Sequence, residues 1–173
     1  MIRIRTATEN DLPRLLEIYN DIIINTTAVY DYEPHTIEMR KQWWEAKKAQ
    51  GFPVFVAEED GRIVGFSSIG PFRAWAAYKY SVENSVYVAS NARGKGIGKL
   101  LIPPLLDASK SLGMHTVIAG IDATNEASIK LHKRFGFEEV IKAALLCTRL
   151  SADRVHRGRS VAVRPDQMNR RVH

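Results

Sequence analysis

The segment SVYVASNARGKGIGKLL, residues 85–101, constrains the fold more than any other stretch of the sequence. It begins with the alternation of a strand and ends in a leucine-rich run typical of a helix. Between them, residues 93–98 hold three glycines in RGKGIG. A loop in this position turns backbone N–H groups and the positive end of the helix toward one point. The segment therefore predicts a strand–loop–helix unit with an anion site, most simply for a phosphate.

Two familiar phosphate loops do not fit this segment. A P-loop requires Ser or Thr after its Gly-Lys pair, whereas Lys95 is followed by Gly96. The dinucleotide spacing G-x-G-x-x-G is not met either. On spacing alone, a glycine-rich turn without a ligand stays open as the alternative.

The other patterns predict an α+β (mixed α/β) fold with strand–loop–helix–strand at its centre. Asp60-Gly61 is the expected turn of a hairpin. Pro103 and Pro104 fall inside the helix after the glycine loop, where we expect a kink or a sequence fault. The predicted strands are residues 2–7, 82–88 and 115–121, together with the two arms of the hairpin at 53–70. The predicted helices span about residues 10–24, 36–50, 97–112 and 125–135.

The net charge of +6 is confined to the end of the chain. Residues 142–173 contain eight Lys or Arg and two Asp, so the preceding 141 residues hold 17 basic and 17 acidic side chains. A folded nucleic-acid-binding domain needs its basic side chains on one face. We therefore expect no nucleic-acid partner.

Length and composition indicate a single cytoplasmic domain. The chain has 173 residues, 45% of them hydrophobic, which is ordinary for a globular protein. No apolar run approaches the roughly 20 residues that cross a membrane, and the first residues lack the apolar region of a secretory signal. Cys147 has no second cysteine with which to form an internal disulfide. No metal cluster is evident, and we expect no membrane partner.

Spaced motifs resemble one enzyme family. Residues 93–98 fit the R/Q-x-x-G-x-G/A signature of the GCN5-related N-acetyltransferases. The resemblance is closer to their phosphinothricin and methionine sulfoximine acetyltransferase family and covers residues 1 to about 140. The motifs that carry it are YND (19–21), NTTA (25–28), VENSVYV (82–88), RGKGIG (93–98) and NEASIKLHKRFGF (125–137).

This resemblance implies acetyl-CoA as the co-substrate, with no metal. It implies a central twisted mixed sheet flanked by helices, in which a splayed strand pair holds the pantetheine arm. The Val88 N–H would face the developing oxyanion. The implied cofactor-binding residues are Val86, Tyr87, Val88, Arg93, Gly94, Lys95, Gly96, Ile97, Gly98 and Asn125.

Acetyl transfer to an amine requires removal of a proton from the amine and a proton for the departing thiolate. Glu83 lies on the strand face opposite Val82 and Val86, and the family's proposed base falls at its position. His132 stands where the superfamily often has a proton-donating Tyr, and its alternative is a packed core histidine. Both are our candidate catalytic residues. Arg73, which can pair with a carboxylate or phosphinate, and Trp75 are the candidate acceptor-binding residues.

The resemblance ends near Val140. We therefore divide the chain into an acetyltransferase domain, 1–140, and an atypical basic segment, 141–173, which lacks aromatic residues and a strand–hairpin pattern. Our hypothesis for this segment is a frameshift or a replaced terminus. The expected activity is transfer of acetyl from acetyl-CoA to the α-amine of a small amino-acid-like acceptor, by direct attack in a ternary complex. The alternatives are a peptide or polyamine acetyltransferase and an inactive coenzyme A-binding protein. The family also implies a homodimer.

Overall fold

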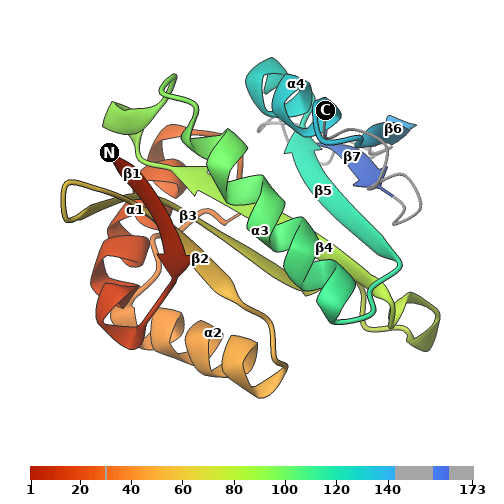
Figure 1. The fold of residues 1–173 in the computed structure, drawn as a ribbon, viewed down its shortest axis with the longest axis horizontal. Helices are drawn as coiled ribbons and strands as arrows, with labels where there is room; N and C mark the ends of the chain where they lie inside the picture. Colours follow the sequence, from red (N-terminus) through yellow and green to blue (C-terminus); the bar gives the residue numbers. More distant parts are fainter. Residues whose placement is uncertain (30, 143–157, 164–173) are drawn as a thin grey trace, which may run out of the picture.

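The computed structural model describes residues 1–29, 31–142 and 158–163. Their seven strands form one sheet with the order β1-β2-β3-β4-β5-β7-β6 (Figure 1). The strands are β1 (Ile2–Thr6), β2 (Val54–Glu59), β3 (Arg62–Pro71), β4 (Ser81–Val88), β5 (Thr116–Asp122), β6 (Glu138–Lys142) and β7 (Gly158–Val163). The α-helices are α1 (Leu12–Asn25), α2 (Ile37–Ala49), α3 (Ile97–Ser111) and α4 (Glu126–Lys133).

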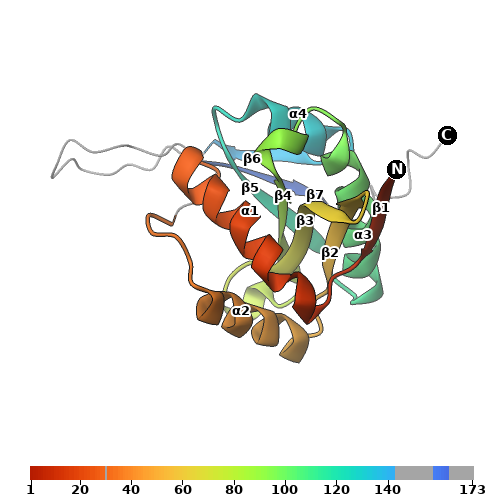
Figure 2. The same cartoon turned by 90° about the vertical axis from the view of Figure 1, so that its left-hand side faces the viewer.

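The sheet is mixed and has helices on both faces. β1 to β4 pair antiparallel in chain order, β4 and β5 pair parallel, and β7 pairs antiparallel with β5 and β6. The chain crosses from β4 to β5 through α3, as a parallel connection requires. Figure 2 shows α1 and α2 on one side of the sheet and α3 on the other. The predicted α+β fold is confirmed.

The predicted hairpin is also present. Asp60 and Gly61 connect β2 to β3 with φ of 50° and 77°. Positive φ at both central residues is the backbone of a type I′ turn, whose twist matches that of the two strands.

Helix α3 continues without interruption through Pro103 and Pro104. Each proline removes one backbone hydrogen bond, which disfavours an interior helical position. The same stretch buries Leu101, Ile102 and Leu105 completely against the sheet. Apolar burial on this scale opposes the proline cost, since a fully buried Leu or Ile contributes about 1.5–3 kcal/mol.

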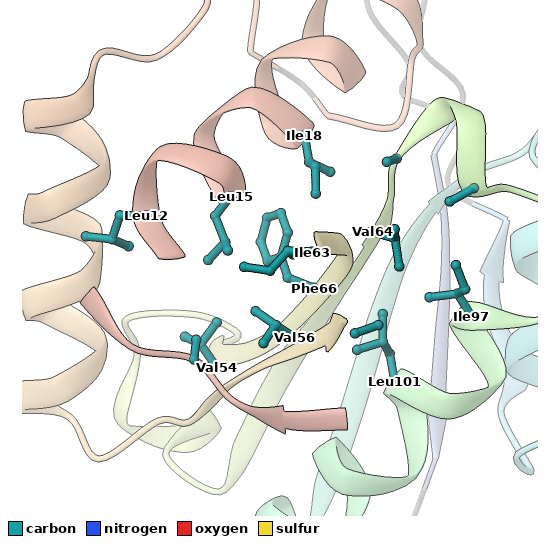
Figure 3. Packing of buried hydrophobic residues seen from close by; sticks show 14 of the residues in the cluster. Leu12, Leu15, Ile18, Val54, Val56, Ile63, Val64, Phe66, Ile97 and Leu101 are labelled. Carbon is teal, nitrogen blue, oxygen red and sulfur yellow. The ribbon is translucent and has the colours of Figure 1, made fainter. Parts of the chain in front are cut away.

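Two apolar clusters hold the helices on the sheet. The larger joins α1, β2, β3 and the start of α3 around Phe66, which is fully buried (Figure 3). The second joins the later turns of α3 to β4, β5 and α4, with Val82, Val117 and Phe137 among its members. Because both clusters include β3 or β4 and α3, they fix the start of α3 beside the end of β4.

The basic C-terminal segment contributes a strand, contrary to the expectation that it lacks a strand pattern. β7 lies between β5 and β6, and its residues 158–163 pair with all six positions from Val117 to Asp122. The apolar patch SVAV at 160–163 is short, so it is a weak strand signal in the sequence alone. Its strand conformation depends on partners on both sides. The sheet therefore extends beyond the expected domain boundary at residue 140.

Candidate functional site

The central feature of the site is a fork between β4 and β5. The two strands pair from Ser81 with Thr116 to Asn84 with Ala119, and the pairing ends there. Both strands continue, β4 to Val88 and β5 to Asp122. β4 remains paired with β3 as far as Val88, and β5 remains paired with β7. The fork is therefore an opening inside the sheet, bounded by two supported strands.

Backbone groups of β4 face this opening. The Ala89 N–H donates to the Val64 carbonyl at 2.9 Å, on the β3 side. Because backbone groups alternate along a strand, those of Val86 and Val88 face the other side, toward β5. β5 pairs with β4 only as far as Asn84, so Val86 and Val88 present donors and acceptors to the fork. An extended chain with amide groups can pair with such an edge as an added strand does.

The glycine loop lies at the open end of the fork. Gly94 and Gly96 have φ of 81° and 80°, values that a side chain with a Cβ rarely adopts. Gly96 caps α3 in the left-handed conformation and turns the chain directly from the loop into the helix. The first N–H groups of a helix have no partner within it, and they carry its positive end. The loop therefore has the geometry of an anion site.

The side chains around the loop are engaged elsewhere. The Lys95 ammonium pairs with the Glu59 carboxylate at 3.0 Å, and the Ile97 side chain is buried in the core. Arg93 is exposed, and its Nε donates to the Val88 carbonyl at 3.4 Å. The donors that the loop geometry itself directs to one point are therefore backbone N–H groups.

Two adjoining cavities lie against the fork. One, of about 230 Å³, is lined by both strands and by α4. The other, of about 210 Å³, is bounded by α1, the end of β4, and parts of α3 and α4. Of the candidate residues, the first contains Glu83, Val86, Tyr87, Asn125 and His132, and the second contains Val86, Tyr87, Val88, Arg93, Gly98 and Asn125. The candidates outside both linings are Arg73, Trp75, Gly94, Lys95, Gly96 and Ile97.

Glu83 is half-buried in the wall of the first cavity. Burial raises the pKa of its carboxyl above the ordinary value, and the positive charge of Arg73, the N–H of Gly120 and the charge of Lys47 each oppose that rise. A carboxylate with a raised pKa is a stronger base than an exposed one. These features agree with the expectation that Glu83 acts as a base, which stays a prediction.

Lys47 supports Glu83 from α2. Its ammonium donates to the Ile69 carbonyl of β3 and lies over Gly70, which pairs with Glu83. Burial lowers the pKa of Lys47 to about 8. Sequence reasoning missed this residue, because no recognisable motif surrounds it and only the tertiary fold brings α2 under β3.

A Lys47→Met variant should shift the pH dependence of turnover. The Lys47 charge lowers the pKa of Glu83, so its removal lets that pKa rise, and the acidic limb of the kcat profile moves to higher pH. Lys48→Met is the matched control, because Lys48 is exposed and pairs with Glu45. Steady-state rates across pH measure both variants. An unmoved acidic limb in Lys47→Met contradicts the assignment.

The absence of a side chain at Gly120 leaves room for the Glu83 carboxylate. A Cβ on Gly120 would lie 2.7 Å from Glu83 Oε1, which is closer than such atoms approach. The Gly120 N–H also donates to this carboxylate. The position thus supplies both the space and a donor for the candidate base.

Gly120→Ala is expected to displace the Glu83 carboxylate and to lower kcat by at least about tenfold, because misplacing a general base forfeits part of its contribution. Acetyl-CoA affinity should stay nearly unchanged. In a Glu83→Gln background the same substitution should add little, since the group it displaces is already gone. Equal effects in the two backgrounds would show that Gly120 acts independently of Glu83.

His132 and Asn125 lie on α4 with their polar atoms engaged. The Asn125 side chain caps the helix by accepting the Ser128 N–H at 3.1 Å. His132 is buried, and its ring nitrogens contact the Ser128 carbonyl at 2.8 Å and Asn84 Nδ2 at 3.1 Å. Burial lowers the pKa of His132, and the hydrogen bond to Ser128 partly opposes this. Neutral imidazole is therefore favoured.

The loop between β3 and β4 holds the two candidate acceptor-binding residues on the surface. Arg73 is exposed, with its guanidinium carbon 5.0 Å from the centre of the Phe72 ring, and it affects Glu83 through its charge. Trp75 is 70% exposed, and the centres of its ring and the Tyr78 ring are 6.1 Å apart. Neither residue lines a cavity in this structure, and their contact with an acceptor stays a prediction.

Sequence reasoning also missed a network that joins α1 to residues 31–35 and to α2. Tyr19 donates to the Asp31 carboxylate at 2.9 Å, and Asn20 exchanges two hydrogen bonds with the backbone of His35. The buried Arg40 guanidinium lies 4.1 Å from the centre of the Tyr19 ring. These contacts secure residues 31–35 to α1. Two of its residues, Tyr19 and Asn20, belong to the YND motif at 19–21, to which the sequence alone assigns no role.

A forked sheet followed by a glycine loop at a helix N-terminus defines the class of protein as a transferase of the acetyltransferase fold. Residues 13–137 match the Acetyltransferase (GNAT) family, and the chain belongs to this family. The match spans β4, the loop, α3, β5 and α4, which together build the fork.

Three known proteins illustrate the similarity. The chain is 41% identical over 136 residues to the L-methionine sulfoximine/L-methionine sulfone acetyltransferase of Pseudomonas paraeruginosa, covering 78% of this chain and 79% of the relative. It is 40% identical over 142 residues to the phosphinothricin N-acetyltransferase of Streptomyces coelicolor, covering 80% and 83%. A phosphinothricin acetyltransferase from Sinorhizobium meliloti, solved in complex with acetyl-CoA, superposes with a TM-score of 0.85 at 30% identity, covering 94% and 88%. The resemblance found in the sequence is confirmed.

Two features are absent from the part of the chain that the structure describes. No helix there is long and apolar enough to cross a membrane. The same residues contain no group of three or more His, Cys, Asp or Glu side chains arranged to hold a metal ion.

Proposed function

We propose that the protein is an N-acetyltransferase that moves acetyl from acetyl-CoA to the α-amine of a small amino-acid-like acceptor, of the methionine sulfoximine or phosphinothricin type. The observation that carries the proposal is the fork, in which unpaired backbone groups of β4 meet a half-buried carboxylate, Glu83, in one cavity. The relatives named above are acetyltransferases for acceptors of this chemical class.

The residues present fit acetyl-CoA. The backbone of Val86 and Val88 can pair with the amides of the pantetheine arm, and the loop at Gly94 and Gly96 can hold the pyrophosphate. The second cavity, which reaches Arg93 and Gly98, connects these two places. When bound, acetyl-CoA supplies the acetyl group as a thioester.

The chain's residues support direct attack on that thioester. Glu83 takes a proton from the acceptor's ammonium, directly or through water, because an α-amine is mostly protonated at neutral pH. The neutral nitrogen then forms its bond to the thioester carbonyl carbon. The Val88 N–H, which faces the fork, donates to the oxygen where negative charge develops. The carbon–sulfur bond breaks, the newly acetylated nitrogen releases its extra proton, and the departing thiolate takes up a proton in exchange, so that the neutral amide and the free thiol are formed.

The size of the first cavity favours a small acceptor over a peptide. Its volume of about 230 Å³ is shared with the end of the cofactor arm. Sites for drug-sized ligands are larger, about 300–1,000 Å³.

A steady-state assay tests the proposal. Acetyl-CoA is combined with methionine sulfoximine, phosphinothricin, a panel of amino acids, a polyamine and a short peptide, and the release of free thiol is followed. We expect turnover to be fastest with the first two acceptors. Faster turnover with the peptide or the polyamine would show that the acceptor is not a small amino acid. Acetyl-CoA binding without turnover on any amine would indicate a disabled enzyme.

Three further expectations from the sequence remain proposals. These are a homodimer, a cytoplasmic location, and an altered terminus from residue 141 onward, produced by a frameshift or by replacement. Family membership supports the first two by analogy. The charge jump after Ile141 supports the third. Light scattering after size-exclusion chromatography tests the oligomer, and resequencing of the source DNA tests the reading frame.

A further inference from the structure

Asn84 and His132 form a buried pair at the innermost point of the fork. Asn84 is 6% exposed and His132 is 4% exposed. Asn84 Nδ2 lies 3.1 Å from His132 Nε2, and His132 Nδ1 lies 2.8 Å from the Ser128 carbonyl oxygen. Both side chains line the same cavity as Glu83.

The surroundings of His132 determine which nitrogen carries its proton. A backbone carbonyl can only accept, so Nδ1 must donate to Ser128. In a neutral ring Nε2 then has a lone pair, and the Asn84 amide must turn its NH₂ group toward it. The opposite orientation of the amide would place two acceptors against each other. His132 thus fixes the orientation of Asn84.

This orientation leaves Asn84 Oδ1 as a buried acceptor. Among the described residues it has no hydrogen-bond partner. Most buried polar side-chain atoms in folded proteins are hydrogen-bonded, and an exception calls for an explanation. Since Asn84 lines a cavity, a bound molecule is a candidate source of the missing donor.

The position of Asn84 indicates which part of a bound molecule it meets. Asn84 and Ala119 form the last pair before the strands separate. An extended arm that lies along residues 85–88 therefore has its inner end beside Asn84. The phosphate end of the arm lies at the other end of this run, at the loop that follows Val88.

We propose that His132 is a positioning residue, which holds Asn84 so that Oδ1 accepts a hydrogen bond from an N–H or S–H donor at the sulfur end of the pantetheine arm. The inference rests on the proposed use of acetyl-CoA. It gives His132 a role that needs no proton transfer, since Nε2 carries no proton in this arrangement. It also distinguishes the substrate from the product, because coenzyme A has a thiol donor that acetyl-CoA lacks.

Calorimetric titrations with acetyl-CoA and with coenzyme A test this proposal on the full chain. The wild type is measured first, and its failure to bind either compound refutes the proposed function itself. Asn84→Ala and His132→Leu should each weaken binding about fivefold, which is the typical value of one net hydrogen bond. A loss for both compounds identifies the amide N–H as the donor, and a loss for coenzyme A alone identifies the thiol. No loss for either compound overturns the proposal.

The conservative variant separates positioning from proton transfer. The side chain introduced by His132→Gln has a carbonyl oxygen that can accept from Asn84, so this variant should recover most of the affinity and turnover lost in His132→Leu. It cannot relay protons at neutral pH. Equal losses in the two variants overturn the positioning role. In an Asn84→Ala background, His132→Leu should add nothing, and additive losses likewise count against the pair.

Nitrogen-15 NMR of the histidine rings tests the arrangement in the wild-type protein. The neutral ring of His132 should show a protonated Nδ1 and an unprotonated Nε2 in the wild-type protein. The Asn84→Ala spectrum assigns the signal, because only His132 loses its partner. A proton on Nε2 would place the Asn84 oxygen against the ring and refute the inference.

Discussion

Glu83→Gln is expected to lower kcat by about 10²–10⁴-fold, the usual contribution of a general base. The amide keeps the shape of the side chain and its contact with the Gly120 N–H, but it cannot take a proton from the acceptor. Acetyl-CoA affinity should stay nearly unchanged, because the amide matches the carboxylate in size and the proposed role of Glu83 is proton removal. Single-turnover and steady-state rates, with calorimetry for binding, make the comparison.

The pH dependence gives the same prediction a second readout. A base must be deprotonated, so wild-type turnover should fall as the pH drops toward the pKa of Glu83, which burial raises above its ordinary value. The Gln variant should lose this limb. Glu45→Gln is the control, since Glu45 is exposed on α2 and pairs with Lys48. A loss of less than about threefold at every pH would remove Glu83 from the mechanism.

The parts of the site that the sequence predicted are those encoded locally. The alternation through Val88, the glycine spacing at 93–98 and the leucines of α3 predict a strand, a turn and a helix, and the structure places all three there. The Asp60-Gly61 turn likewise depends on neighbouring residues only. Local chemistry of this kind survives folding because the tertiary structure agrees with it.

The residues that surround Glu83, namely Lys47 and Gly120, could not be predicted in this way, because each lies on a different element from Glu83. Lys47 reaches Glu83 through Gly70, and Gly120 meets it across the parallel pair. Neither relation follows from sequence spacing, since it depends on the register between strands distant in the chain. The pairing of Asn84 with His132 likewise joins residues 48 positions apart.

The C-terminal strand was missed for a related reason. Residues 158–163 read GRSVAV, which has only a short apolar run and two polar residues. Strand propensity is weak evidence when the neighbours are unknown. β7 forms because β5 and β6 offer it edges on both sides. A cofactor site built on β4 and β5 therefore has a continuous sheet behind it on both sides of the fork.

Gly96→Val is expected to weaken acetyl-CoA binding by at least about 100-fold. A Cβ at this position meets nothing within 4 Å in the protein, so the substitution does not disturb the core, and the larger side chain should crowd the phosphate end of bound acetyl-CoA. The φ of 80° also disfavours a β-branched residue, which turns the loop N–H groups away from one point. Losing two charge-assisted hydrogen bonds, each of about 1.5–3 kcal/mol, accounts for such a change.

The control for backbone strain is Gly113→Val. Gly113 follows α3 with a φ of 69°, and a Cβ on it would likewise meet nothing within 4 Å, but it lies at the opposite end of the helix from the loop. Both variants should lose comparable stability on thermal unfolding, whereas only Gly96→Val should lose acetyl-CoA affinity in a calorimetric titration. If Gly96→Val binds acetyl-CoA as tightly as Gly113→Val with its fold intact, the pyrophosphate is held elsewhere. The proposed orientation of the cofactor along the fork would then be wrong, because that orientation depends on the loop holding its phosphate end.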